Sequence, residues 1–283
     1  MAKTKTLFDK IDKQILSLEE LRALDRELSF RPASPEGATT LSAEQVAAYH
    51  RDGYLMPLPL FDEHQIGEYR RLFDALLEAV LAEGGDSLSV LDPQLEHGRM
   101  YDLMFEPRLL AYLKDLVGPN VVCWGLHYFC KLPHDDKQVS WHQDAYYWPF
   151  EKSRTVTVWL AIDDADHDNG CMQFVASSHL HGGIDHRVTR EDEKNALRFT
   201  VDGVEAHGRV VDVTLQAGQV SLHSDLLLHG SGANTSDRRR TGLTLRYIDA
   251  DVGNYSDWHK NGVLVCGSDS RGLWGNPRRP ERD

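Results

Sequence analysis

Three residues in the second half of the chain could together hold a metal ion. His142 and Asp144 are separated by one residue, and two such residues in a β-strand project from the same face. His229 ends an apolar run, 226–228, that predicts a strand, and it precedes a glycine turn. Two imidazoles and one carboxylate are the ligands of non-haem Fe(II) oxygenases, and they leave coordination positions open for a bidentate co-substrate and O₂.

An arginine run after His229 could anchor that co-substrate. Arg238, Arg239 and Arg240 lead into an alternating segment, 243–248, that predicts a strand. An arginine near the end of a strand is the expected partner of a dicarboxylate in a barrel interior. Each feature alone has an ordinary interpretation, since the chain has 14 histidines, a histidine can be buried for structural reasons, and an arginine run is usually solvated. Their order along one β-rich region favours the metal site.

Short strands must position these residues. After about residue 120 the chain has apolar or alternating runs rich in β-branched and aromatic residues, separated by turn signals. Because no helical pattern intervenes, we expect an antiparallel sandwich or barrel and not a parallel α/β sheet. The predicted strands are 121–131, 155–162, 171–175, 209–215, 219–223 and 243–248.

Helices are expected before these strands, as an outer layer of one domain. Ser42 and Asp62 each begin a capping-box pattern, and Gly53 and Gly84 should end the two helices that follow. We expect a helical extension over 1–40 and a single domain over 41–283. The other predicted elements are an amphipathic helix within 8–28, an extended segment over 54–60 and a helix over 106–116.

Composition excludes several classes of protein. The 283 residues carry 31 basic and 44 acidic side chains, a net charge of −13, which disfavours nucleic acid and anionic membranes as partners. Four cysteines without a C-x-x-C pair argue against a disulfide scaffold or zinc ribbon and fit a reducing compartment. The N-terminus has no secretory pattern and no apolar run could span a membrane. We expect a cytoplasmic monomer or homodimer that binds a small-molecule substrate.

The sequence resembles the phytanoyl-CoA dioxygenase family of Fe(II)/2-oxoglutarate-dependent oxygenases over about residues 41–275. Arg240 lies 11 positions after His229, the spacing at which this family places its 2-oxoglutarate arginine. The resemblance implies a mainly β fold with flanking α-helices, a double-stranded β-helix (jelly-roll, cupin-like) barrel. The segments that carry it are 41–46, 53–55, 142–144, 147–150, 168–172, 177–179 and 229–234.

The resemblance also implies roles for individual residues. His142, Asp144 and His229 would bind Fe(II), Arg240 would pair with the C5 carboxylate of 2-oxoglutarate, and Ser231 would donate its hydroxyl to the same group. The carboxylate of Asp144 favours hydroxylation, because halogenases of this superfamily have alanine or glycine there. Further residues expected near the co-substrate are Trp159, Lys131 and His127.

The aromatic run after the metal motif is the candidate substrate wall. Tyr146, Tyr147 and Trp148 could cradle an apolar ring or enclose a cationic amine, and Arg99 and Trp274 are further candidates. The net negative charge of the chain disfavours a CoA thioester, whose phosphates usually bind a basic patch. We expect hydroxylation of an unactivated C–H bond in an amine, amino acid or natural-product intermediate, with release of succinate and CO₂. The alternatives are an acyl-CoA substrate, desaturation, epimerisation or cyclisation, and a non-catalytic metal-binding β-barrel.

Overall fold

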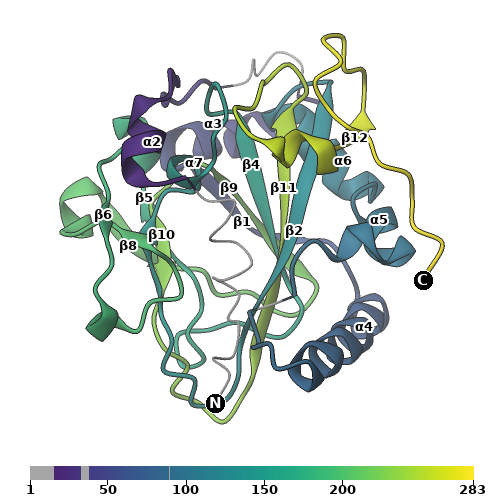
Figure 1. The fold of residues 1–283 in the computed structure, drawn as a ribbon, viewed down its shortest axis with the longest axis vertical. Helices are drawn as coiled ribbons and strands as arrows, with labels where there is room; N and C mark the ends of the chain where they lie inside the picture. Colours follow the sequence, from purple (N-terminus) through teal and green to yellow (C-terminus); the bar gives the residue numbers. More distant parts are fainter. Residues whose placement is uncertain (1–15, 33–37, 89) are drawn as a thin grey trace.

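Two antiparallel sheets form the body of the protein (Figure 1) in a computed structural model that describes residues 16–32, 38–88 and 90–283. The larger sheet has the strand order β1-β9-β4-β11-β2-β12 and the smaller one β3-β10-β5-β8. No ladder joins the two sheets within these residues, so the barrel is not closed by hydrogen bonds. The expected fold, an antiparallel double-stranded β-helix with flanking helices, is confirmed.

Every predicted strand corresponds to a strand of the structure. The larger sheet consists of β1 (Tyr54–Pro59), β2 (Val121–Lys131), β4 (Thr155–Ala161), β9 (Gln219–Ser224), β11 (Arg240–Asp249) and β12 (Val263–Cys266). The smaller sheet consists of β3 (Val139–His142), β5 (Gln173–Ala176), β8 (Arg209–Asp212) and β10 (His229–Ser231), and a separate pair is formed by β6 (Arg187–Val188) and β7 (Phe199–Thr200). The strands that the sequence did not predict have two to four residues, too few to establish an alternation.

Helices cover one face of the larger sheet (Figure 1). Both predicted capping boxes are present, at Ser42 and Asp62, and Gly53 ends its helix with a φ of 86°, a conformation that glycine adopts at little cost. Of the amphipathic helix predicted within 8–28, the part up to residue 15 lies outside the described residues. The α-helices are α2 (Leu18–Ala23), α3 (Ala43–Asp52), α4 (Glu63–Ala82), α5 (Gly98–Leu103), α6 (Pro107–Leu116) and α7 (Asp144–Tyr147).

Short 3₁₀ helices lie in the connections. They are η2 (Pro93–Leu95), η3 (Ser178–His181), η4 (Glu191–Glu193), η5 (Val204–His207) and η6 (Asp257–Asn261). Within the described residues, no helix combines the length and the apolar character that crossing a bilayer requires.

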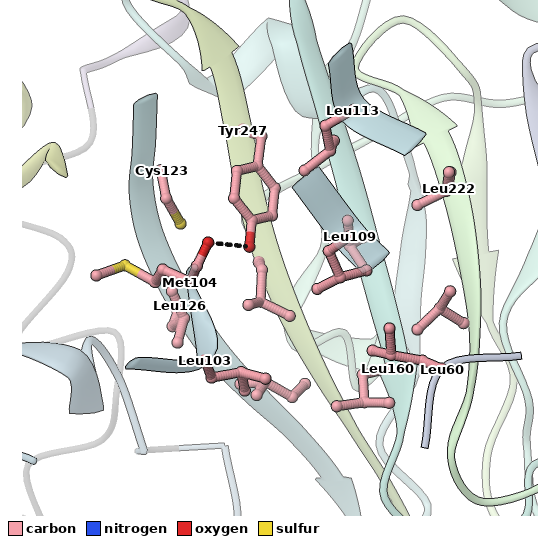
Figure 2. Packing of buried hydrophobic residues seen from close by; sticks show 14 of the residues in the cluster. Leu60, Leu103, Met104, Leu109, Leu113, Cys123, Leu126, Leu160, Leu222 and Tyr247 are labelled. Carbon is pink, nitrogen blue, oxygen red and sulfur yellow. Dashed lines mark hydrogen bonds between the residues drawn. The ribbon is translucent and has the colours of Figure 1, made fainter. Parts of the chain in front are cut away.

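The two faces of the larger sheet have different chemistry. On β11, Leu243, Leu245 and Tyr247 face the helices and belong to the main apolar core, while Arg240 and Arg246 alternate with them and line internal cavities. Figure 2 shows this core, where the Tyr247 hydroxyl donates to the backbone carbonyl of Met104 at 3.2 Å. Burial of each large apolar side chain contributes about 1.5–3 kcal/mol. The outer face therefore stabilises the sheet and leaves its inner face free for polar residues.

A β-bulge in β2 changes which residues face the helices. Arg246 of β11 is paired with Gly125, but the next residue, Tyr247, is paired with Cys123, so Trp124 is the extra residue. A bulge redirects the side chains that follow it. Cys123 before the bulge and Leu126 after it both belong to the helix-side core, although they are three positions apart. The bulge directs Trp124 to the inner side, where it lines a cavity.

Candidate metal centre and co-substrate pocket

His142, Asp144 and His229 meet at one point, with ligand atoms that all lie within 4.8 Å of one another. His142 ends β3, His229 begins β10, and the two are opposite each other in the ladder of these strands. The expectation that His142 and Asp144 share one strand face is wrong, because β3 ends at His142 and Asp144 begins α7. The run 226–228 is also not a strand. A turn of the chain, and not the alternation of a strand, brings the carboxylate to the imidazoles.

Backbone carbonyls set the orientation of both imidazoles. The Nδ1 atom of His142 lies 2.8 Å from the carbonyl of Ser140, and that of His229 lies 3.0 Å from the carbonyl of Leu227. Because a carbonyl only accepts, each Nδ1 carries the hydrogen and each Nε2 offers a lone pair. The two Nε2 atoms lie 3.7 and 4.0 Å from Asp144 Oδ1. This is the arrangement found around protein metal ions, whose histidine ligands are fixed by their second nitrogen.

The charge states of these side chains fit a divalent cation. Burial lowers the pKa of His229 well below its usual value, so the imidazole is neutral at neutral pH. Burial alone would raise the pKa of Asp144, but the adjacent imidazoles of His142, His223 and His229 outweigh it and hold that pKa well below its ordinary value. Neutral imidazoles and an ionised carboxylate are the forms that bind metals.

The oxygen of Asp144 that faces away from the two ligand imidazoles also has neighbours. The Thr157 hydroxyl donates to Asp144 Oδ2 at 3.0 Å, and His223 Nε2 lies 3.8 Å from the same oxygen. Both nitrogens of the His223 ring are buried and have no hydrogen-bond partner among the described residues. The sequence analysis missed His223. Its signal was the pattern of β9, in which Val220 and Leu222 face the helices and His223 therefore faces inward.

Arg240 is a buried cation without an acidic partner. Its Nε and Nη2 donate to the carbonyl of Gly170 at 3.2 and 2.8 Å, and its Nη1 donates to the carbonyl of Phe129 at 3.2 Å. No carboxylate of the described residues forms an ion pair with it, and its guanidinium carbon lies 5.8 Å from the centre of the Trp159 ring. Burial lowers the pKa of Arg240 to about 10, so the charge persists at neutral pH. An uncompensated buried charge is costly, and an anionic ligand would compensate it.

A cavity of about 40 Å³ connects Arg240 with the metal ligands. Trp159 and Ser231 line it, as the predictions for the co-substrate require. Lys131 does not line it but donates from Nζ to the Ser231 hydroxyl oxygen at 2.7 Å, which leaves the Ser231 hydrogen free to donate. Burial and the adjacent Arg240 lower the pKa of Lys131 to about 6. Lys131 therefore orients Ser231 at one end of this pocket.

A second cavity, of about 180 Å³, opens on the other side of His142 and Asp144. Tyr147 and Trp148, both predicted substrate residues, line it. His127 lines this larger cavity and not the one around Arg240. The structure therefore places His127 on the side expected for the substrate.

Three other predicted substrate residues line neither of these two cavities. The Tyr146 ring stacks on His186 with ring centres 3.9 Å apart, on the opposite side of α7. Arg99 donates to Glu68 at 2.8 Å on the helical layer, and Trp274 donates from its indole nitrogen to the carbonyl of Ala250 at 3.0 Å. Of the three residues of the aromatic run, Tyr147 and Trp148 line the larger cavity, whereas one turn of helix directs Tyr146 away from it.

Comparison with known sequences agrees with the family resemblance seen in the sequence motifs. The family model for phytanoyl-CoA dioxygenase matches residues 49–242. Phytanoyl-CoA dioxygenase domain-containing protein 1 of Bos taurus is 31% identical over 250 residues, which cover 83% of this chain and 84% of that protein. The peroxisomal phytanoyl-CoA dioxygenase of Bos taurus is 24% identical over 234 residues, which cover 75% of this chain and 69% of that protein.

Solved structures with the same fold are non-haem oxygenases. The non-heme monooxygenase ThoJ superposes with a TM-score of 0.70 at 27% identity, covering 84% of this chain and 88% of ThoJ. The epimerase SnoN in complex with Fe³⁺, alpha ketoglutarate and nogalamycin RO superposes with a TM-score of 0.61 at 26% identity, covering 75% of this chain and 84% of SnoN. Similar scaffolds therefore support more than one oxidative reaction.

Proposed function

This chain belongs to the phytanoyl-CoA dioxygenase family, and from that premise we propose that it is an Fe(II)- and 2-oxoglutarate-dependent hydroxylase of a small-molecule metabolite. The metabolite would be an amine, an amino acid or a natural-product intermediate, and the reaction would release succinate and CO₂. The observation that carries the proposal is one cavity that joins a three-ligand centre to the Arg240 guanidinium, which forms no ion pair with any described residue. A barrel that only stores metal has no use for that guanidinium.

The described residues fit both cofactors. His142, Asp144 and His229 would hold the iron, and Arg240 would hold the distal carboxylate of 2-oxoglutarate with a hydroxyl hydrogen bond from Ser231. Iron and 2-oxoglutarate together supply the activation of O₂ that breaks an unactivated C–H bond. The protein orients both cofactors and excludes water from them, because all five of these residues are buried.

Each supporting residue has a definable task. Thr157 holds the second oxygen of Asp144, so that the carboxylate offers Oδ1 to the metal. Trp159 provides a flat wall under the Arg240 guanidinium, and Lys131 orients the hydroxyl of Ser231. These contacts preorganise the pocket before any ligand enters, which lowers the free-energy cost of binding.

Ligand binding and turnover test the proposal separately. We expect 2-oxoglutarate to raise the melting temperature of protein loaded with Mn(II), and succinate to form when Fe(II), O₂ and a substrate are supplied. Arg240→Met should abolish the 2-oxoglutarate-dependent shift while metal binding remains, and Asp144→Ala should abolish metal binding. Arg238→Met, a change on an exposed arginine paired with Asp166, is the matched control. A wild-type protein that binds neither Mn(II) nor 2-oxoglutarate would contradict the proposal.

A different oxidative outcome on the same cofactors is the second candidate. The similarity to the epimerase SnoN, whose solved complex contains Fe³⁺ and alpha ketoglutarate, supports it. The mass of the product distinguishes the two, since hydroxylation adds one oxygen, epimerisation changes no mass, and desaturation or cyclisation removes two hydrogens. An acyl-CoA substrate is tested in the same assay by supplying acyl-CoA thioesters beside free metabolites.

A further inference from the structure

We propose that the larger cavity binds an organic carboxylate with an apolar body, and that Arg246 pairs with its carboxylate group. This inference rests on the proposed function and specifies the substrate class of the same site. Arg246 lines both the cavity around the metal ligands and the larger cavity beyond them. It is therefore the cation that a substrate would meet beside the metal.

Arg246 has no partner that would satisfy its charge. None of the described residues offers it a hydrogen bond or an ion pair, and its buried Nε is unpartnered. Burial lowers the pKa of Arg246, and the nearby Asp144 and Asp92 only partly oppose that shift, because neither reaches ion-pair distance. Asp92 Oδ1 already accepts hydrogen bonds from Gln94 and from the backbone of Leu126, and Asp144 belongs to the metal centre.

The aromatic walls hold the guanidinium in place and exclude a cationic ligand there. The Arg246 guanidinium carbon lies 5.3 Å from the centre of the Trp124 ring and 5.6 Å from that of Trp148. A protein cation thus already occupies the ring faces on which an amine would depend. A second positive charge at this position would be repelled, so the structure disfavours the amine among the candidate metabolites.

A second unpartnered donor points the same way. The indole nitrogen of Trp124 is buried without an acceptor among the described residues, and the β-bulge directs this side chain to the cavity side. A buried donor without an acceptor destabilises the protein, because it has lost its hydrogen bonds to water. An oxygen acceptor in the cavity could satisfy both Trp124 and Arg246, and a carboxylate has two such oxygens.

The apolar and aromatic lining residues describe the body of the ligand. Leu88, Leu91, Leu197, Phe129 and Trp258 contribute apolar or aromatic surface to the same cavity. Apolar walls with a few placed polar groups are typical of small-molecule sites. We therefore expect a ring or branched chain against these walls, with the carboxylate at Arg246 and the C–H bond that reacts near the metal.

Matched neutral and charged probes test the inference on the complete protein loaded with Mn(II) and 2-oxoglutarate. The probes are 3-phenylpropanoate, its amide and 3-phenylpropylamine, together with cyclohexane carboxylate and its amide. Quenching of tryptophan fluorescence reports binding, since Trp124, Trp148 and Trp258 line the cavity. We expect each carboxylate to bind at least 10-fold more tightly than its amide, and the amine to bind most weakly.

Variants of Arg246 test whether this residue causes the preference for a carboxylate over an amide. Arg246→Gln should reduce the preference for carboxylate to less than 2-fold and leave the 2-oxoglutarate affinity within 2-fold of wild type, whereas Arg99→Gln should change neither. Arg246→Lys, which keeps the charge, should restore part of the preference if the Gln variant folds poorly. Equal binding of carboxylate and amide by the wild type, or no carboxylate binding, overturns the inference. So does a loss of 2-oxoglutarate affinity in Arg246→Gln with selectivity unchanged, which would assign Arg246 to the co-substrate. If the wild-type protein binds 2-oxoglutarate in any of these cases, the proposed function stands although the inference about Arg246 fails.

Discussion

Replacement of Gly242 by alanine should show how tightly the co-substrate pocket is built. A Cβ atom on Gly242 would lie 1.9 Å from Cζ2 of Trp159, so the indole ring would have to retreat by about 1.5 Å to reach ordinary contact. Trp159 is 2% exposed and has little space to move. Overpacking of this kind costs about 1–3 kcal/mol, which for a chain of this length lowers the melting temperature by roughly 2–5 °C.

The same displacement should weaken 2-oxoglutarate binding, because the Trp159 ring lies under the Arg240 guanidinium. Differential scanning fluorimetry of the Mn(II) form, with and without 2-oxoglutarate, measures both effects. Gly232→Ala is the control, since nothing lies within 4 Å of a Cβ there. In a Trp159→Leu background the Gly242→Ala change should have little further effect, because the clashing atoms are gone. A Gly242→Ala protein that melts within about 1 °C of wild type and binds 2-oxoglutarate normally would refute the reasoning.

Three further predictions concern the support of the site and the fold. Thr157→Val removes the hydroxyl that donates to Asp144 and should lower Mn(II) affinity about 10-fold. Thr244→Val, a change in the same cavity, should leave Mn(II) affinity unchanged. Equal Mn(II) affinities of Thr157→Val and the wild type would refute this role of Thr157. Burial raises the pKa of Asp225 from 3.8 to about 7, so the native state holds this proton more tightly than the unfolded state, and stability should fall as pH rises from about 4 to 7. Asp225→Asn should flatten that fall in thermal unfolding, and an unchanged pH slope would contradict it. Asp115→Ala should cost about 2–3 kcal/mol in urea unfolding, because its buried carboxylate accepts three backbone hydrogen bonds from residues 39–41; a loss below about 0.5 kcal/mol would show that water replaces those bonds.

Much of the fold could be predicted from the sequence because its signals are local. The capping boxes at Ser42 and Asp62 and the stop at Gly53 depend on a few adjacent residues. The long strands were predicted from their alternation and β-branched content. The bulge at Trp124 was not predicted, since β2 is buried along almost its whole length and its sequence gives no sign that its inner and outer faces exchange.

The part of the site that could be predicted consists of residues that belong to short sequence motifs. The order of His142, Asp144, His229 and Arg240 predicted a common site, and the structure brings these residues to adjoining positions. His223 and Arg246 could not be identified in the same way, because their proximity to Asp144 depends on the pairing of β9, β4 and β11. Thr157 of β4 is paired with both of them, and that register is a property of the sheet, not of any one segment.

The facing positions of His142 and His229 across β3 and β10 have a consequence for how this scaffold can diversify. A slip of one residue at that pair would turn one imidazole to the opposite face, so an insertion beside either histidine should disrupt the site. Loops that join them carry no such constraint and can lengthen or exchange residues while the ligands stay in place. Engineering toward new substrates should therefore randomise the connections around the cavity mouth and leave the paired strands unchanged.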